Sequence, residues 1–139
     1  MKQIKTIEQH LGEADGVANV LVAGWEIFEL ISDLAAACAE QSVDLYPAFM
    51  FARGAAVDGR NAIACAPSVP AAGAALSGGP VLPTGDASEV ADALAGLASA
   101  LSMRLQATAR LAADDGDRVA CESAARDADR ISELLAGSA

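Results

Sequence analysis

Alanine is the most frequent residue of this chain and the one that most restricts its fold. The 139 residues include 34 alanines, whereas only 4% are aromatic. Alanine has the highest helix propensity of all residues and is depleted in strands, which favour β-branched and aromatic side chains. The composition therefore predicts an all-α protein. The length fits one domain over residues 1–139.

The charge of the chain restricts its partners. The formal net charge is −10 and the sequence pI is about 4.3, so the protein repels a phosphate backbone. Hydrophobic residues make up 53% of the chain, which is far above the level typical of disordered segments. We therefore expect an acidic, folded, soluble protein that has no nucleic acid partner.

The three cysteines and the apolar stretches bear on the cellular compartment. Cys38, Cys65 and Cys121 are widely spaced and form no CxxC pair, which argues against a disulfide framework and against zinc. We interpret them as small buried residues in a reducing cytoplasm. The N-terminal residues lack the apolar run of a signal peptide, and the apolar stretch 17–25 is too short to cross a membrane. These observations predict a cytoplasmic location and no membrane partner.

Apolar side chains that recur every three or four residues predict helices. One helix is expected over residues 14–40, a second over 47–66, a third over 86–113, and a fourth after the Asp-Asp-Gly-Asp turn at 114–117. The apolar stripe of the third helix contains Val90, Leu94, Leu97, Leu101, Leu105, Thr108 and Leu111. Residues 1–13 are expected to form a short leading helix or an arm.

The connection between the second and third predicted helices is unusually long. Residues 67–85 contain four of the five prolines and no charged residue, and they are rich in glycine and alanine. Connections beyond about 15 residues in a compact domain are usually functional loops, crossovers or disordered segments. We predict a flexible linker, and a four-helix bundle whose topology is either up-down-up-down or one in which the linker crosses the bundle.

Residues with catalytic or metal-binding chemistry are sparse. The only histidine, His10, has no cysteine near it in the sequence, and we interpret it as a solvated surface residue. The turn at 114–117 does not fit a calcium loop, because Leu111 and Ala113 would occupy the first and third ligand positions. No nucleotide-binding glycine motif is present. The sequence predicts no cofactor, no metal site and no catalytic residue, and it leaves enzymatic activity uncertain, with a lean towards none.

The stretch YPAFMFARG at residues 46–54 is the strongest candidate for a functional surface. All five aromatic residues fall between positions 25 and 51. Phe49 and Phe51 are two residues apart and diverge by roughly 200° on a helix, so only one of them can point into the core. Aromatic residues, Met and Arg are enriched at interface centres. The candidate interface or pocket residues are Trp25, Phe28, Tyr46, Phe49, Phe51 and Arg53.

These patterns leave more than one function open. The first prediction is a non-catalytic protein–protein interaction or oligomerisation module that forms a homodimer through its first two predicted long helices or binds another protein. The alternative is a small-molecule-binding or enzymatic domain with an aromatic pocket between those two helices. Ordinary core packing would also account for the aromatic cluster.

Overall fold

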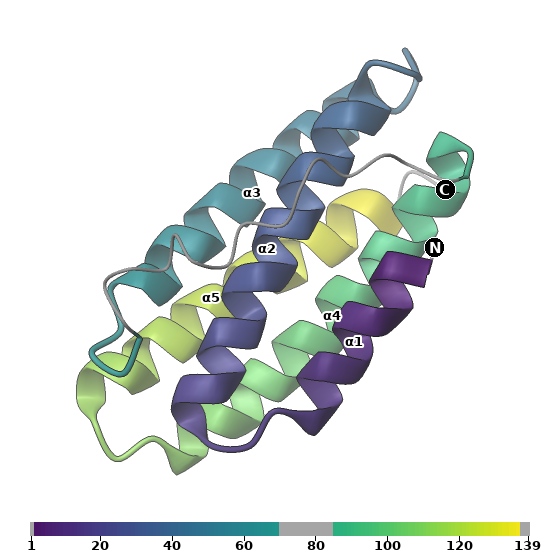
Figure 1. The fold of residues 1–139 in the computed structure, drawn as a ribbon. Helices are drawn as coiled ribbons and strands as arrows, with labels where there is room; N and C mark the ends of the chain where they lie inside the picture. The colour runs from purple at the N-terminus through teal and green to yellow at the C-terminus, as the bar shows by residue number, and fades with distance from the viewer. Residues whose placement is uncertain (1, 70–84, 137–139) are drawn as a thin grey trace.

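The computed structural model describes residues 2–69 and 85–136, and all regular structure in these residues is helical. Four long helices pack side by side, and a shorter N-terminal helix lies against two of them (Figure 1). The helices are α1 (Lys2–Glu13), α2 (Val17–Ala39), α3 (Tyr46–Ala64), α4 (Ala87–Leu111) and α5 (Asp115–Ala136). The predicted all-α class is confirmed.

The predicted count of four helices is not confirmed, because five helices are present in the described residues. The additional one is α1, which occupies the segment expected to be a short helix or an arm. Its apolar residues Ile4, Ile7 and Leu11 are spaced three and four positions apart, and Ile4 and Leu11 are buried. They pack α1 against α2 and α4. In addition, Arg104 donates a hydrogen bond of 2.6 Å from Nη2 to the carbonyl of Ala14, which ties the turn after α1 to α4.

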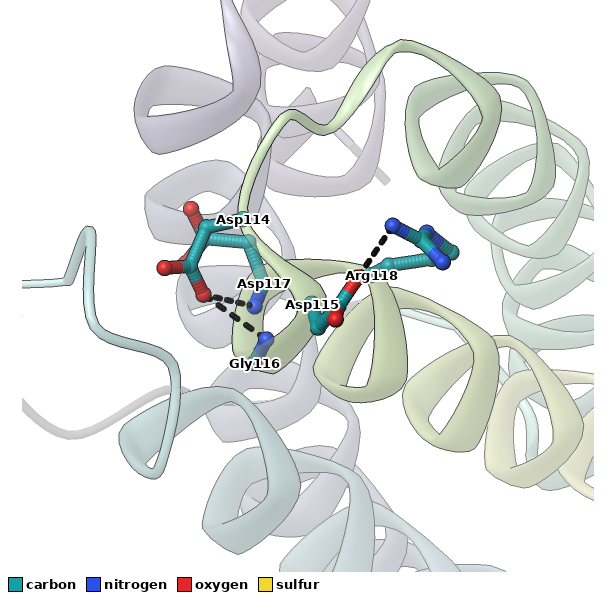
Figure 2. A network of polar contacts seen from close by, with 5 residues as sticks. All are labelled: Asp114, Asp115, Gly116, Asp117 and Arg118. Atoms are coloured by element: carbon teal, nitrogen blue, oxygen red, sulfur yellow. Dashed lines mark hydrogen bonds and ion pairs between the residues drawn. The ribbon is translucent and has the colours of Figure 1, made fainter.

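The starts of α4 and α5 follow from local side-chain chemistry. At the start of α4, Asp86 accepts a hydrogen bond from the backbone N–H of Glu89 at 2.8 Å, as expected for an N-cap. At the start of α5, Asp114 Oδ1 accepts from the N–H groups of Gly116 and Asp117, at 2.7 and 3.2 Å (Figure 2). The turn at 114–117 therefore caps α5. These side chains satisfy N–H groups that have no partner within the helix.

The long helices pack in the cyclic order α2, α3, α5, α4, and neighbours in this order run antiparallel. The α2–α3 and α4–α5 pairs are hairpins with short turns. As a result, α3 and α4 run in the same direction and lie diagonally across the bundle, so α3 ends at the end opposite to the start of α4. Of the two topologies left open by the sequence, this arrangement is the crossover. Residues 70–84 of the predicted flexible linker lie outside the described residues.

The beginning of the predicted linker is tied to the bundle. The buried carboxylate of Asp117, in the first turn of α5, accepts a 3.0 Å hydrogen bond from the N–H of Ser68 and a second one from the Ser68 hydroxyl. Val69 packs against the hydrophobic core. These contacts hold the residues that follow α3 against the start of α5.

The helix interfaces are filled by leucine, isoleucine, alanine and two phenylalanines. The predicted stripe of α4 is buried from Val90 to Thr108, whereas Leu111 is exposed because the helix ends there. The apolar stripe of α5 is buried throughout: Cys121, Ala124, Ala128, Ile131 and Leu135. No described helix is long and apolar enough to cross a membrane.

Candidate functional site

The structure divides the six candidate residues between the core and the surface. Phe28 of α2 and Phe49 of α3 are fully buried, with 0% of their surfaces exposed. The ring of Phe28 lies over Gly59, where a Cβ atom would come within 2.4 Å of the Phe28 Cζ atom. The Phe28 ring therefore fills the close contact between α2 and α3, and Phe49 belongs to the buried core.

Tyr46 and Phe51 lie on the outside of α3. Tyr46 is 50% exposed and Phe51 is 62% exposed, and Val43 in the preceding turn is 91% exposed. The expected divergence of Phe49 and Phe51 is confirmed, because one is buried and the other faces solvent. Three large apolar side chains are thus exposed within nine residues of sequence.

Trp25 and Arg53 flank the contact between α2 and α3. Trp25 is half-buried against the core, and Arg53 is exposed. The ion pair that joins these helices is formed by Arg60 and Glu29. Burial and the charge of Glu29 raise the pKa of Asp33, while the positive charges of Arg53 and Arg60 act in the opposite direction. Arg53 therefore contributes to a mixed-charge cluster on this side of the bundle.

On the side of α3 away from Arg53, another set of exposed residues lies along the contact with α5. Phe51, Asp58 and Cys65 are spaced seven residues apart, so they lie on one face of α3, and all three are exposed. At the Cys65 end, a groove of about 420 Å³ lies between the two helices. Its lining comprises Ala62, Cys65, Asp115, Gly116, Val119, Ala120 and Ser123. We call the surface formed by these residues, Phe51, Asp58 and the α5 residues Arg126, Asp127 and Arg130 the α3/α5 face.

Two aspartates meet halfway along the α3/α5 face. Burial raises the pKa of Asp127, and the negative charge of Asp58 across the helix contact raises it further. The positive charges of Arg130 and Arg126 lower it, but the net shift is upward. Among the described residues, the two ion pairs found involve none of these four side chains.

The raised pKa of Asp127 has a consequence for stability. The folded protein holds this proton more tightly than the unfolded chain, so this contribution to stability is present at low pH and is lost as the pH rises from 3.8 through the raised pKa. We expect Asp127→Asn to raise the Tm of dilute protein at pH 7 and to leave it unchanged below pH 3.8. Asp129→Asn, an exposed position on the same helix, is the control for the change in net charge. A lower Tm of Asp127→Asn at pH 7 would contradict this account.

A second groove, between α1 and α2, contains the only histidine. It measures about 380 Å³ and is lined by Gln3, Thr6, Ile7, His10, Glu26 and Leu30. The expectation that His10 is exposed is confirmed, but the residue lies beside a carboxylate-bearing helix at the edge of a largely apolar hollow. Its volume is within the range of small-molecule sites, which is roughly 300–1,000 Å³.

The three cysteines differ in exposure and in the environment of their thiols. All three are free thiols. Burial raises the pKa of the Cys38 thiol, and burial with the nearby charges of Asp117 and Glu122 raises the pKa of Cys121 to about 11, so both are poor nucleophiles. The expectation that all three are buried is wrong for Cys65, which is exposed because it follows the last turn of α3. In the described part of the chain, no group of three potential metal ligands occurs.

The sequence interpretation missed the α3/α5 face. On α3, the sequence feature that indicates this face is the seven-residue spacing of Phe51, Asp58 and Cys65. These side chains differ too much in polarity to form an apolar stripe. On α5 the signal is weaker, because Val119 stands among charged and small residues. Only the packing of α3 on α5 brings the two sets together.

Comparison of the chain with protein-family models, with curated proteins and with solved structures finds no match in any of the three.

Proposed function

We propose that this protein is a non-catalytic association module that forms a homodimer through α3. The observation that carries this proposal is the exposure of Tyr46 and Phe51, at 50% and 62%, on a helix whose other aromatic residue is fully buried. Aromatic residues are enriched at the centres of protein interfaces, and a large exposed apolar side chain loses unfavourable contact with water when a partner covers it.

The rest of the fold supports this role as a scaffold. In the proposal, α2–α5 act as a four-helix bundle whose packed core holds α3 in a fixed position, so its exposed side chains need little reordering on association. The three free thiols, one of them exposed, fit a protein that works in the reducing cytoplasm.

Native mass spectrometry and sedimentation velocity of the untagged protein test the proposal. We expect a concentration-dependent dimer, and we expect Phe51→Glu to weaken it at least tenfold because a charge would enter an apolar contact. Helicity should be unchanged, since Phe51 makes no buried contact in the monomer core. Met103→Glu is the matched control, because Met103 is 70% exposed on α4 and lies away from α3. A wild-type protein that stays monomeric at the highest concentration sedimented would contradict the homodimer.

Small-molecule binding is the second candidate function, and the observation that favours it is the groove between α1 and α2. A few polar groups, from Thr6, His10 and Glu26, stand around an apolar floor formed by Ile7 and Leu30. The same native mass spectra distinguish the two functions. A reproducible extra mass that is lost in the variant Leu30→Glu would support the groove as a binding site, whereas protein masses without any addition would contradict it.

A further inference from the structure

We propose that two copies of this chain associate through the α3/α5 face in an antiparallel arrangement, so that Phe51 of each copy enters the α3/α5 groove of the other. This inference rests on the proposed homodimer and specifies its surface and geometry.

The contacts of α3 and the residues that follow it with α5 fix how residues face one another along this surface. Ser68 bonds to Asp117 at one end, and Cys65 lines the groove with Val119. Further along, Asp58 acts electrostatically on Asp127. These pairs follow one antiparallel register, and α3 and α5 lie side by side along it (Figure 1).

The spacing on α3 makes the face suitable for a two-fold contact. Phe51 precedes Asp58 by seven residues and Cys65 follows it by seven, so each lies about 10 Å from Asp58 along the helix. A two-fold axis that passes at the level of Asp58, at right angles to the helices, therefore places Phe51 of one copy over Cys65 of the other. Phe51 would enter the groove of about 420 Å³ and would cover Val119, which is 62% exposed.

The positive and negative charges at the middle of the α3/α5 face balance one another. Asp58 and Asp127 contribute −2, and Arg126 and Arg130 contribute +2, so this cluster is formally neutral on a chain whose net charge is −10. Within one copy the two aspartates repel each other, and none of the four side chains takes part in the ion pairs found among the described residues. Because this part of the face is formally neutral, a second copy can approach it without the repulsion expected elsewhere between two chains of net charge −10.

The area of the α3/α5 face sets the expected affinity of the dimer. The 19 residues of α3 span about 28 Å, and two helices side by side are about 20 Å wide, so the footprint is on the order of 500–600 Å². Stable interfaces bury roughly 600–1,000 Å² on each partner, so this one lies just below that range. We accordingly expect a weak dimer, with a Kd in the micromolar range.

Disulfide trapping tests the geometry with the native thiol of Cys65 as the reporter. The variant Phe51→Cys is oxidised with copper phenanthroline in air, and the products are analysed by non-reducing electrophoresis and peptide mapping. Residues 51 and 65 lie 14 residues apart on one rigid helix, about 21 Å, so they cannot form a disulfide within one copy. We expect a covalent dimer in which residue 51 of one copy is linked to residue 65 of the other. Wild-type Cys65 should not link to itself, because the two copies of this residue also lie about 21 Å apart.

Two control variants define the outcome. Phe51→Cys combined with Cys65→Ser, and Met103→Cys at an equally exposed position on α4, should both stay uncrosslinked. Links between two copies of residue 51, or no link at all in a protein that sediments as a dimer, would overturn this geometry but leave the homodimer standing. A monomer in sedimentation together with no covalent product would overturn both proposals.

Discussion

Phe49→Ala is expected to lower the free energy of unfolding by about 3–5 kcal/mol, whereas Phe51→Ala, two residues away, should change it by less than about 0.5 kcal/mol. Phe49 is fully buried, so truncation removes the transfer free energy of its ring and leaves a cavity. Phe51 is 62% exposed and makes little contact within one copy. The two substitutions remove the same atoms from the same helix and differ only in the direction of the side chain.

Urea unfolding followed by circular dichroism measures both variants. The protein should be dilute enough to be monomeric, since loss of a dimer contact would otherwise add to the effect of Phe51→Ala. Equal losses for the two variants would mean that Phe51 is also part of the core. In that case Phe51 would not face solvent, and both proposals, which rely on its exposure, would be wrong.

Gly59→Ala is expected to destabilise the protein by about 2 kcal/mol, within the range of roughly 1–3 kcal/mol found when a packed core is overfilled. The new Cβ atom would lie 2.4 Å from Cζ of Phe28, and all three of the nearest ring atoms are closer than 3.0 Å. The ring is fully buried and cannot move aside without displacing its neighbours. This cost exceeds the gain of roughly 1 kcal/mol that alanine offers over glycine in a helix.

Gly54→Ala on the same helix is the matched control and should have the opposite sign. A Cβ atom at Gly54 meets no other atom within 4 Å, so only the gain in helix propensity remains, at about 0.5–1 kcal/mol. Thermal and urea unfolding of the two variants give the comparison. If Gly59→Ala were as stable as wild type, the close approach of α2 and α3 described above would be incorrect.

Gly54 and Gly59 both lie within α3, where glycine weakens a helix relative to alanine, and close approach of another helix is one reason for a glycine at such a position. The structure assigns that role to Gly59 and leaves Gly54 at the surface. Five residues separate the two, which places them roughly 140° apart around the helix. Which side of α3 faces α2 depends on how the two helices pack, and the local sequence does not determine it.

The helices themselves could largely be read from the sequence. The starts of α4 and α5 carry side chains that cap them, Asp86 and Asp114, and the apolar residues of the long helices repeat with the helical period. The exception is α1, whose three apolar residues are too few to make a stable helix alone. It is helical because α2 and α4 offer a surface on which those residues are buried.

The candidate site, too, could be predicted from the sequence only in part. That Phe49 and Phe51 diverge follows from the geometry of one helix, but that Phe49 is the buried one follows from where α2 lies. The meeting of Asp58 with Asp127 joins residues 69 positions apart in the chain, which no local pattern indicates. Likewise His10 becomes part of a groove only because α1 folds back along α2.

Composition and periodicity by themselves determined that the chain is helical and acidic, and approximately where its long helices begin and end. These are properties of backbone propensity and of side chains a few residues apart, which act in the same way wherever the helix is placed. Tertiary structure alone decided the diagonal placement of α3 and α4, the division of the aromatic residues between core and surface, and the formation of the α3/α5 face. These depend on contacts between distant segments, and their geometry is set by how side chains of different sizes fill the space between helices.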